Sequence, residues 1–226
     1  MIFAPDFFPL WLLLLTSTVG ALGFLLALIK APWQLIARNS ERQHLVFGAS
    51  ILLGLFWIMR VEALEILTFH PLVMTAITLM LGWHFAMLAG AVAQLVLLVA
   101  GFDHWSMIGV NYLVTAMVPA SLSFGIVQLC QRLPFKNLFV FLFGAGFLGA
   151  ALCSAAVAVV TVSLLLLAGY DLSMKEIARE APILLILMFP EGFINGTIVT
   201  ALTVFKPHLM KTFNEDVYFG DSDKKG

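Results

Sequence analysis

The sequence predicts an all-α membrane protein, a polytopic bundle of about seven transmembrane helices of which the third is short. Hydrophobic residues make up 62% of the chain and charged residues only 11%, and the mean hydropathy is +1.03. Soluble domains are far less apolar than this. Long apolar runs alternate with short charged loops, and no linker or internal repeat divides them. We therefore expect one integral membrane domain over residues 1–214 and a polar cytoplasmic tail over residues 215–226.

Seven apolar runs are candidate transmembrane helices, because a helix needs about 20 apolar residues to cross a hydrocarbon layer about 30 Å thick. They cover residues 9–30, 43–60, 71–81, 84–101, 107–130, 137–169 and 182–205. The third run extends only about 17 Å at about 1.5 Å per residue, so it must start in the preceding loop, tilt or end short. The sixth is overlong, and Gly144, Gly146 and Gly149 predict that it tilts or bends.

Lysine and arginine in the short loops orient the bundle, because loops rich in these residues stay in the cytoplasm. Such loops lie at residues 30–44, at 131–136 and after residue 205. The loops at residues 60–70, 102–106 and 170–181 are acidic or mixed. Seven spans with an external N-terminus and a cytoplasmic C-terminus satisfy every loop. The predicted location is a lipid bilayer, which the chain crosses several times.

The composition also excludes several classes of function. A net charge of −1 without a basic face argues against a nucleic-acid partner. Cys130 and Cys153 form neither a disulfide framework nor a metal-binding spacing. No phosphate-binding loop, Ser-His-Asp order or kinase signature is present, so we expect neither an enzyme nor a covalently bound cofactor.

The most informative polar residues lie in the last apolar run, in the segment from Phe189 to Gly196. Glu191 follows Pro182 by about nine residues, or roughly 13 Å of helix, which places its carboxyl group near the bilayer midplane. Asn195 lies four residues further, on the same helix face. Inserting an ionised group at this depth costs about 2.5 to 3.5 kcal/mol, so such groups normally face a cavity or a partner. We interpret the pair as part of a functional pocket; the alternative is that both side chains only join neighbouring helices.

Further polar residues are expected on the outer half of the bundle, where they can meet Glu191. His70 precedes the third span, Asp103 and His104 precede the fifth, and Asn111 and Thr115 lie inside the fifth. Carboxylates and imidazoles are ordinary ligands of divalent transition metals. The sequence therefore predicts a cation-binding vestibule that opens outward. Its candidate metal ligands are His70, Asp103, His104 and Glu191, and its further lining residues are Asn111, Thr115 and Asn195. The alternative for His104, which precedes Trp105, is an anchoring role at the membrane interface.

Several of these residues belong to sequence motifs. The motifs are Leu67 to Leu72, Thr75 to Trp83, Gly109 to Leu113, Val118-Pro119, Met188 to Gly196, Lys206-Pro207 and Lys211 to Phe213. They resemble motifs of the CbiM-like permeases of energy-coupling-factor transporters, which are the substrate-binding membrane subunits of cobalt and nickel importers. The last three are most similar to a proteobacterial branch of that family. The resemblance covers about two-thirds of the chain, from Leu67 to Tyr218.

The resemblance implies a seven-helix permease that binds a divalent cation from outside and works with a separate transmembrane coupling subunit and cytoplasmic ATPases. In the cobalt and nickel members, the metal is held by the free N-terminal amine, a histidine at position two and a histidine at the mouth of the third helix. His70 matches the last of these, but position two is Ile2 and the first histidine is His44, so the N-terminal chelate is missing. Two functions stay open: a substrate-capture subunit with a transition-metal cation as its substrate, and a non-transporting membrane accessory or assembly factor that keeps the permease fold.

Overall fold

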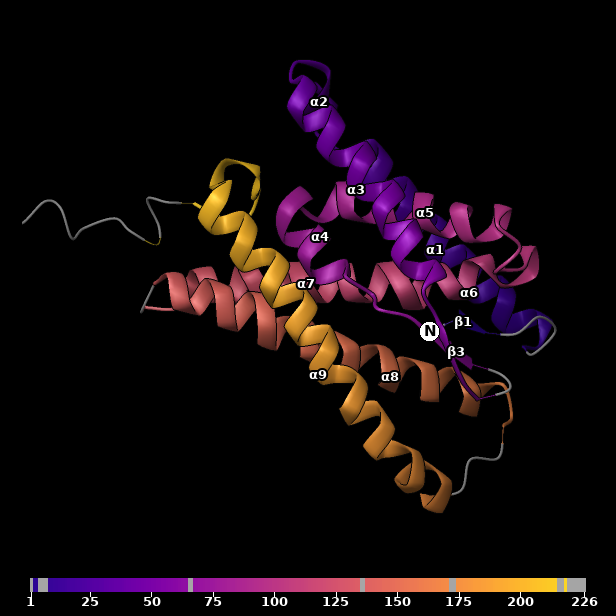
Figure 1. The fold of residues 1–226 in the computed structure, drawn as a ribbon. Helices are drawn as coiled ribbons and strands as arrows, with labels where there is room; N and C mark the ends of the chain where they lie inside the picture. Colours follow the sequence, from indigo (N-terminus) through magenta and orange to yellow (C-terminus); the bar gives the residue numbers. More distant parts are fainter. Residues whose placement is uncertain are drawn as a thin grey trace, which may run out of the picture.

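The structure is a computed structural model that describes residues 2–3, 8–64, 67–134, 137–170, 174–214 and 218 (Figure 1). The predicted tail over residues 215–226, apart from Tyr218, and the predicted cytoplasmic residue Lys136 lie outside the described residues. The described residues form an α-helical bundle, which confirms the predicted fold class. Each of the seven apolar runs contains a helix.

The first four apolar runs correspond to α1 (Leu10–Lys30), α3 (Ser40–Ile58), α4 (Met74–Leu81) and α5 (Trp83–Val99). A short helix, α2 (Trp33–Ala37), lies in the loop between the first two runs. α3 begins where the Asn39 side chain accepts a hydrogen bond from the Arg42 N–H, a common N-cap. α4 ends at Gly82, whose φ of 79° lets the chain turn so that α5 begins at the next residue.

The remaining runs contain two departures from regular α-helix. α6 (Ile108–Tyr112) and α7 (Val118–Arg132) are joined by a π-helical turn at Leu113–Met117, which Pro119 favours because it cannot donate to the preceding turn. A second π-helical segment, Val140–Leu148, leads into α8 (Gly149–Leu167). The helix therefore changes its pitch at the glycines that predicted a tilt or bend. α9 (Met174–Phe205) completes the bundle.

Four helical stretches are long and apolar enough to cross a membrane, namely Leu10–Lys30, Trp105–Arg132, Val140–Leu167 and Met188–Phe205. Trp83–Val99 is apolar but shorter, and α3 begins with five polar residues. α4 has only eight residues, which is too short to cross about 30 Å of hydrocarbon. The protein is membrane-embedded, while the number of seven crossings stays a prediction.

The loops gather at two ends of the bundle. At one end, the Arg42 guanidinium donates to the His208 carbonyl at 2.8 Å, and the Gln131 amide donates to the Thr212 carbonyl at 2.8 Å. The start of α3, the end of α7 and the segment after α9 thus lie together, as their shared positive charge predicts. At the other end, the Arg60 guanidinium donates to the Phe102 carbonyl at 3.1 Å. Which of the two ends faces the cytoplasm stays a prediction.

A small antiparallel sheet at this second end was not predicted from the sequence. Its strands are β1 (Ile2–Phe3), β2 (Val61–Leu64) and β3 (Leu67–Phe69), in the order β1-β3-β2. Ile2 pairs with Thr68, and Phe3 pairs with Leu67. Strands of two to four residues show too little alternation to be recognised in so apolar a chain. The sheet places the N-terminal strand beside β3, which leads directly to His70.

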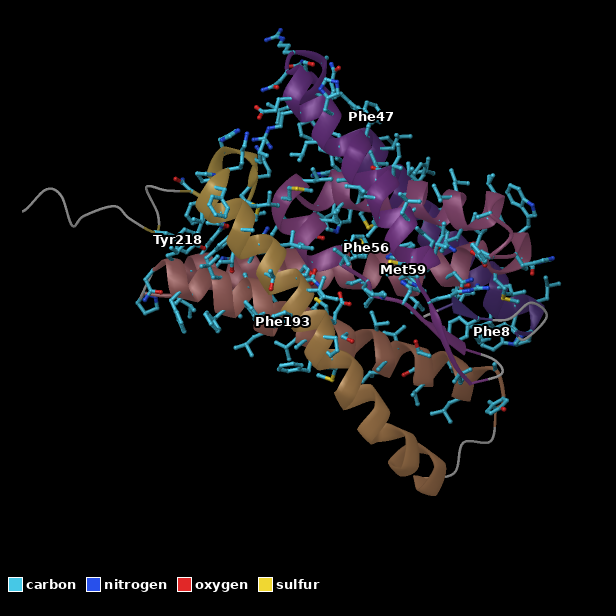
Figure 2. The ribbon with its side chains drawn as sticks, viewed as in Figure 1. Phe8, Phe47, Phe56, Met59, Phe193 and Tyr218 are labelled. Carbon is cyan, nitrogen blue, oxygen red and sulfur yellow. The ribbon has the colours of Figure 1, made fainter. Side chains whose placement is uncertain are left out.

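α4 lies in the interior of the bundle, next to α5, α7, α8 and α9 (Figure 1). All eight of its residues are buried. Large apolar side chains such as Phe47 and Phe193 instead cover the outside of the bundle (Figure 2), where they are 64% and 57% exposed. An apolar exterior is expected of helices that face lipid, and the polar side chains are then left to meet inside.

Candidate functional site

The carboxylate of Glu191 lies at the N-terminus of α4. The Leu72 N–H donates to its Oε2 atom and the Val73 N–H donates to its Oε1 atom, both at 2.8 Å. The first amide groups of a helix have no partner within that helix, and the helix dipole favours a negative charge there. Glu191 therefore caps α4 from another helix, α9.

Asn195 adds a second contact one helical turn further along α9. Its Oδ1 atom accepts a hydrogen bond from the Ala76 N–H at 2.8 Å, and its Nδ2 group donates to Oε1 of Glu191 at 2.7 Å. The predicted proximity of the two side chains on one helix face is therefore present. Both are buried, and we call them together the α9 cap.

Val73 adopts an unusual backbone conformation at the same place. Its φ is 55°, and it is the only residue other than glycine with a positive φ in the part of the chain that the structure describes. The left-handed region is unfavourable for a β-branched residue. The turn at Val73 accompanies the convergence of two successive N–H groups on one carboxylate.

His70 lies three residues before Val73 and is buried. Its ring is 5.1 Å from the ring of Trp57, whose indole N–H donates to the Leu72 carbonyl at 3.0 Å. The Nδ1 atom is 3.2 Å from the Pro71 carbonyl, a hydrogen bond in which Nδ1 carries the ring proton. Burial lowers the pKa of the imidazole well below its ordinary value, so the ring is neutral at pH 7. A neutral imidazole is the form that binds metal ions.

A second polar network surrounds Asp103. The Asn111 amide donates to Oδ1 of Asp103 at 2.7 Å, and the Gln94 amide donates to Oδ2. The Thr115 hydroxyl donates to Gln94 at 3.4 Å and to the Asn111 carbonyl at 2.7 Å. The structure thus brings together three of the predicted vestibule residues and adds Gln94.

The N-terminal strand connects this network to the His70 segment. The Phe3 N–H donates to Oδ1 of Asn111 at 3.0 Å, while Phe3 also pairs with Leu67 of β3. β1 therefore lies between the Asp103 network and the strand that leads to His70. The predicted vestibule residues form two groups joined by the N-terminal strand.

His104 is exposed at the rim of the second network. Its Nδ1 atom is 2.9 Å from the Ser106 hydroxyl, and its backbone N–H donates to Asp103 at 2.7 Å. Among the described residues, no three side chains of the types His, Cys, Asp or Glu converge as a metal site would require. The four candidate ligands are thus distributed over both groups.

The sequence interpretation overlooked two residues of the site, Gln94 and Trp57. Gln94 is a buried amide inside the apolar run 84–101. Glu191 was selected because it is a polar residue within such a run, and the same reasoning would have selected Gln94. Trp57 could not be selected in this way, because an indole in an apolar run does not reveal which carbonyl it binds.

A comparison with protein families supports the resemblance found in the motifs. The profile of CbiM, described as "Cobalt uptake substrate-specific transmembrane region", matches residues 3–209. The matched range includes both polar groups and α4. No curated protein matches the chain. Because the profile covers nearly the whole chain, this membrane protein belongs to the CbiM family, whose members are transmembrane components of cobalt uptake rather than enzymes.

Proposed function

We propose that this chain is the substrate-capture subunit of an energy-coupling-factor importer, with a divalent transition-metal cation as its substrate. The observation that supports it most is the coincidence of the family match with a buried, neutral imidazole beside the N-terminal strand. His70 is the proposed metal ligand, because imidazole binds cobalt, nickel and zinc alike. The ion itself is left open, since Ile2 supplies no imidazole.

The other residues have supporting roles in this proposal. Asp103 and His104 lie near the predicted outer surface, where the carboxylate of Asp103 attracts a cation toward the bundle and the imidazole of His104 can bind it. Asn111 binds the Phe3 N–H and thereby fixes the N-terminal strand next to β3. The Thr115 hydroxyl binds the backbone carbonyl of Asn111 and lies beside the Gln94 amide, which it helps to position.

A capture subunit needs partners, because no ATP-binding motif is present in this sequence. The proposed partners are a transmembrane coupling subunit and cytoplasmic ATPases. The end of the bundle that carries Arg42, Lys206 and Lys211 is the proposed cytoplasmic side on which these partners act. The proposed location is the bacterial inner membrane.

Cation uptake in cells that lack this gene tests the proposal. Cells complemented with the parent chain or with His208→Ala should accumulate radioactive cobalt or nickel, because His208 is exposed at the opposite end of the bundle. Cells complemented with His70→Ala should not. Uptake that does not depend on the gene would instead favour the second candidate, an accessory or assembly factor, which the missing histidine at position two supports.

A further inference from the structure

We propose that Glu191 and Asn195 are positioning residues, which hold the His70 segment in its binding conformation by capping α4 and do not themselves bind the cation. This inference rests on the proposed function, because it assigns the intramembrane carboxylate a role in the same site. It also decides between the two interpretations of Glu191 that the sequence leaves open.

The hydrogen bonds leave little of the carboxylate for a metal ion. Oε2 of Glu191 accepts from Leu72, and Oε1 accepts from both Val73 and Asn195, all at 2.7 to 2.8 Å. Hydrogen bonds from several N–H groups favour the charged form of a carboxylate and oppose the cost of burying it. Two of the donors are backbone groups of the residues just before α4, so a cation could displace them only by moving the backbone between His70 and α4.

A glutamine cannot take over this arrangement. Its amide offers one accepting oxygen and one donating NH₂ group, whereas both Leu72 and Val73 present N–H donors. One of the two N–H groups would therefore face another donor in a buried place. The swap is close to isosteric but removes half of the cap.

The depth and rotation of α9 that bring Glu191 to α4 are fixed by a close helix contact. A Cβ atom on Gly196 would overlap the ring of Phe147, and one on Gly192 would lie 3.1 Å from the Phe147 carbonyl. Small residues at such a contact let two membrane helices approach closely. Gly192 and Gly196 therefore allow the close helix contact that brings Glu191 and Asn195 to α4.

The chain that follows α9 also holds the other end of α4. The Lys211 N–H donates to the Met80 carbonyl at 2.9 Å, and the Thr212 N–H donates to the Leu79 carbonyl at 3.1 Å. The Thr212 hydroxyl donates to the same Leu79 carbonyl at 2.8 Å. α4 is thus held at both of its ends by the C-terminal part of the chain, so any displacement of α9 is transmitted to the His70 segment.

Hydrogen exchange and metal affinity, measured on the full-length protein in detergent, test the inference together. Glu191→Gln should raise the exchange rate of the Leu72 and Val73 amides by about tenfold or more, the effect of losing a hydrogen bond to a charged group. The affinity for Co²⁺ should fall by about the same factor if the cap positions His70. Ser50→Ala, which removes a buried hydroxyl that bonds only within α3, should change neither.

Second-site rescue separates a positioning residue from a ligand. Val73→Gly relieves the left-handed conformation, so in the Glu191→Gln background it should restore at least half of the lost Co²⁺ affinity. Val73→Ala removes nearly the same atoms but keeps the strain, and it should not rescue. A Glu191→Gln protein that loses Co²⁺ with unchanged amide exchange would show that Glu191 binds the cation and would overturn the inference. Failure of Val73→Gly to restore the affinity would also contradict the positioning role.

Two further measurements apply if Glu191→Gln does not fold or if the parent protein binds no metal ion. If Glu191→Gln does not fold, Asn195→Ala replaces it; this variant should accelerate exchange of the Ala76 amide and weaken Co²⁺ binding, and normal exchange would contradict the cap. If the parent protein binds neither Co²⁺ nor Ni²⁺, the proposed function fails. The exchange measurements still decide whether Glu191 and Asn195 hold the start of α4.

Discussion

Replacement of Val73 by glycine and by alanine gives a quantitative test of the turn that begins α4. Both substitutions remove the two γ-methyl groups of a side chain that is only 3% exposed, so their packing losses are similar. They differ in how the new residue tolerates a φ of 55°. At most positions a protein with glycine is less stable than the same protein with alanine, and at position 73 we expect the opposite order.

The expected difference follows from two opposing terms. The left-handed conformation costs a residue other than glycine about 1 to 2 kcal/mol. Glycine avoids this cost but loses about 0.5 to 1 kcal/mol more backbone entropy than alanine. The Val73→Gly protein should therefore be more stable than the Val73→Ala protein by roughly 0.75 kcal/mol, the difference between the midpoints of the two ranges.

Unfolding of the purified proteins in mixed micelles, followed by tryptophan fluorescence, measures this difference. Gly48→Ala is the control for a position where alanine should give the more stable protein, because Gly48 lies inside α3 and an added Cβ atom meets nothing within 4 Å. Gly48→Ala should stabilise the protein by about 0.5 to 1 kcal/mol. If Val73→Ala is as stable as Val73→Gly or more so, the left-handed turn is not present and the geometry of the α9 cap is wrong.

Three further predictions follow from other parts of the structure. Cysteine-labelling reporters at Ser40 and Lys136 should be cytoplasmic and one at Glu176 external, and finding Ser40 and Glu176 on the same side would reject seven crossings. Gly196→Ala should destabilise the protein by about 1 to 3 kcal/mol through overlap with Phe147, whereas Gly125→Ala, with open space around it, should not; equal effects would contradict the close contact of α9. Asn111→Ala should accelerate exchange of the Phe3 amide and cost about 1 to 3 kcal/mol, and an unchanged Phe3 amide would mean that the N-terminal strand is not held by this network.

The apolar runs were sufficient to predict the helices, because periodicity is not needed when whole segments are hydrophobic. The shortness of the third run was also visible, since α4 fits within residues 71–81. The polar exceptions inside the runs pointed to residues that are buried together, such as Glu191 with Asn195. The loop carboxylate of Asp103 was likewise expected near Asn111, which binds it. A polar side chain in an apolar helix must find a partner, and that requirement can be derived from sequence.

The partner of each polar side chain could not be derived in the same way. Glu191 binds backbone N–H groups of a distant segment, and backbone groups leave no signature in a sequence. The N-terminal strand was missed for the same reason, since two residues that pair through their backbone look like any other pair of apolar residues. The sequence thus predicts that Glu191, Asn195 and Asn111 are buried, and the structure is needed to show that the site residues form two groups.

The most direct test of the proposed function is the number of divalent ions that the purified protein holds. Equilibrium dialysis against radioactive cobalt, with nickel and zinc as competitors, should give one saturable site per chain for the parent protein and for His208→Ala. The same measurement should give no saturable site for His70→Ala, whose fold is verified by unaltered unfolding of the bundle. Absence of saturable binding in the parent, or equal binding in His70→Ala, would contradict the assignment of this chain as a cation-capture subunit centred on His70.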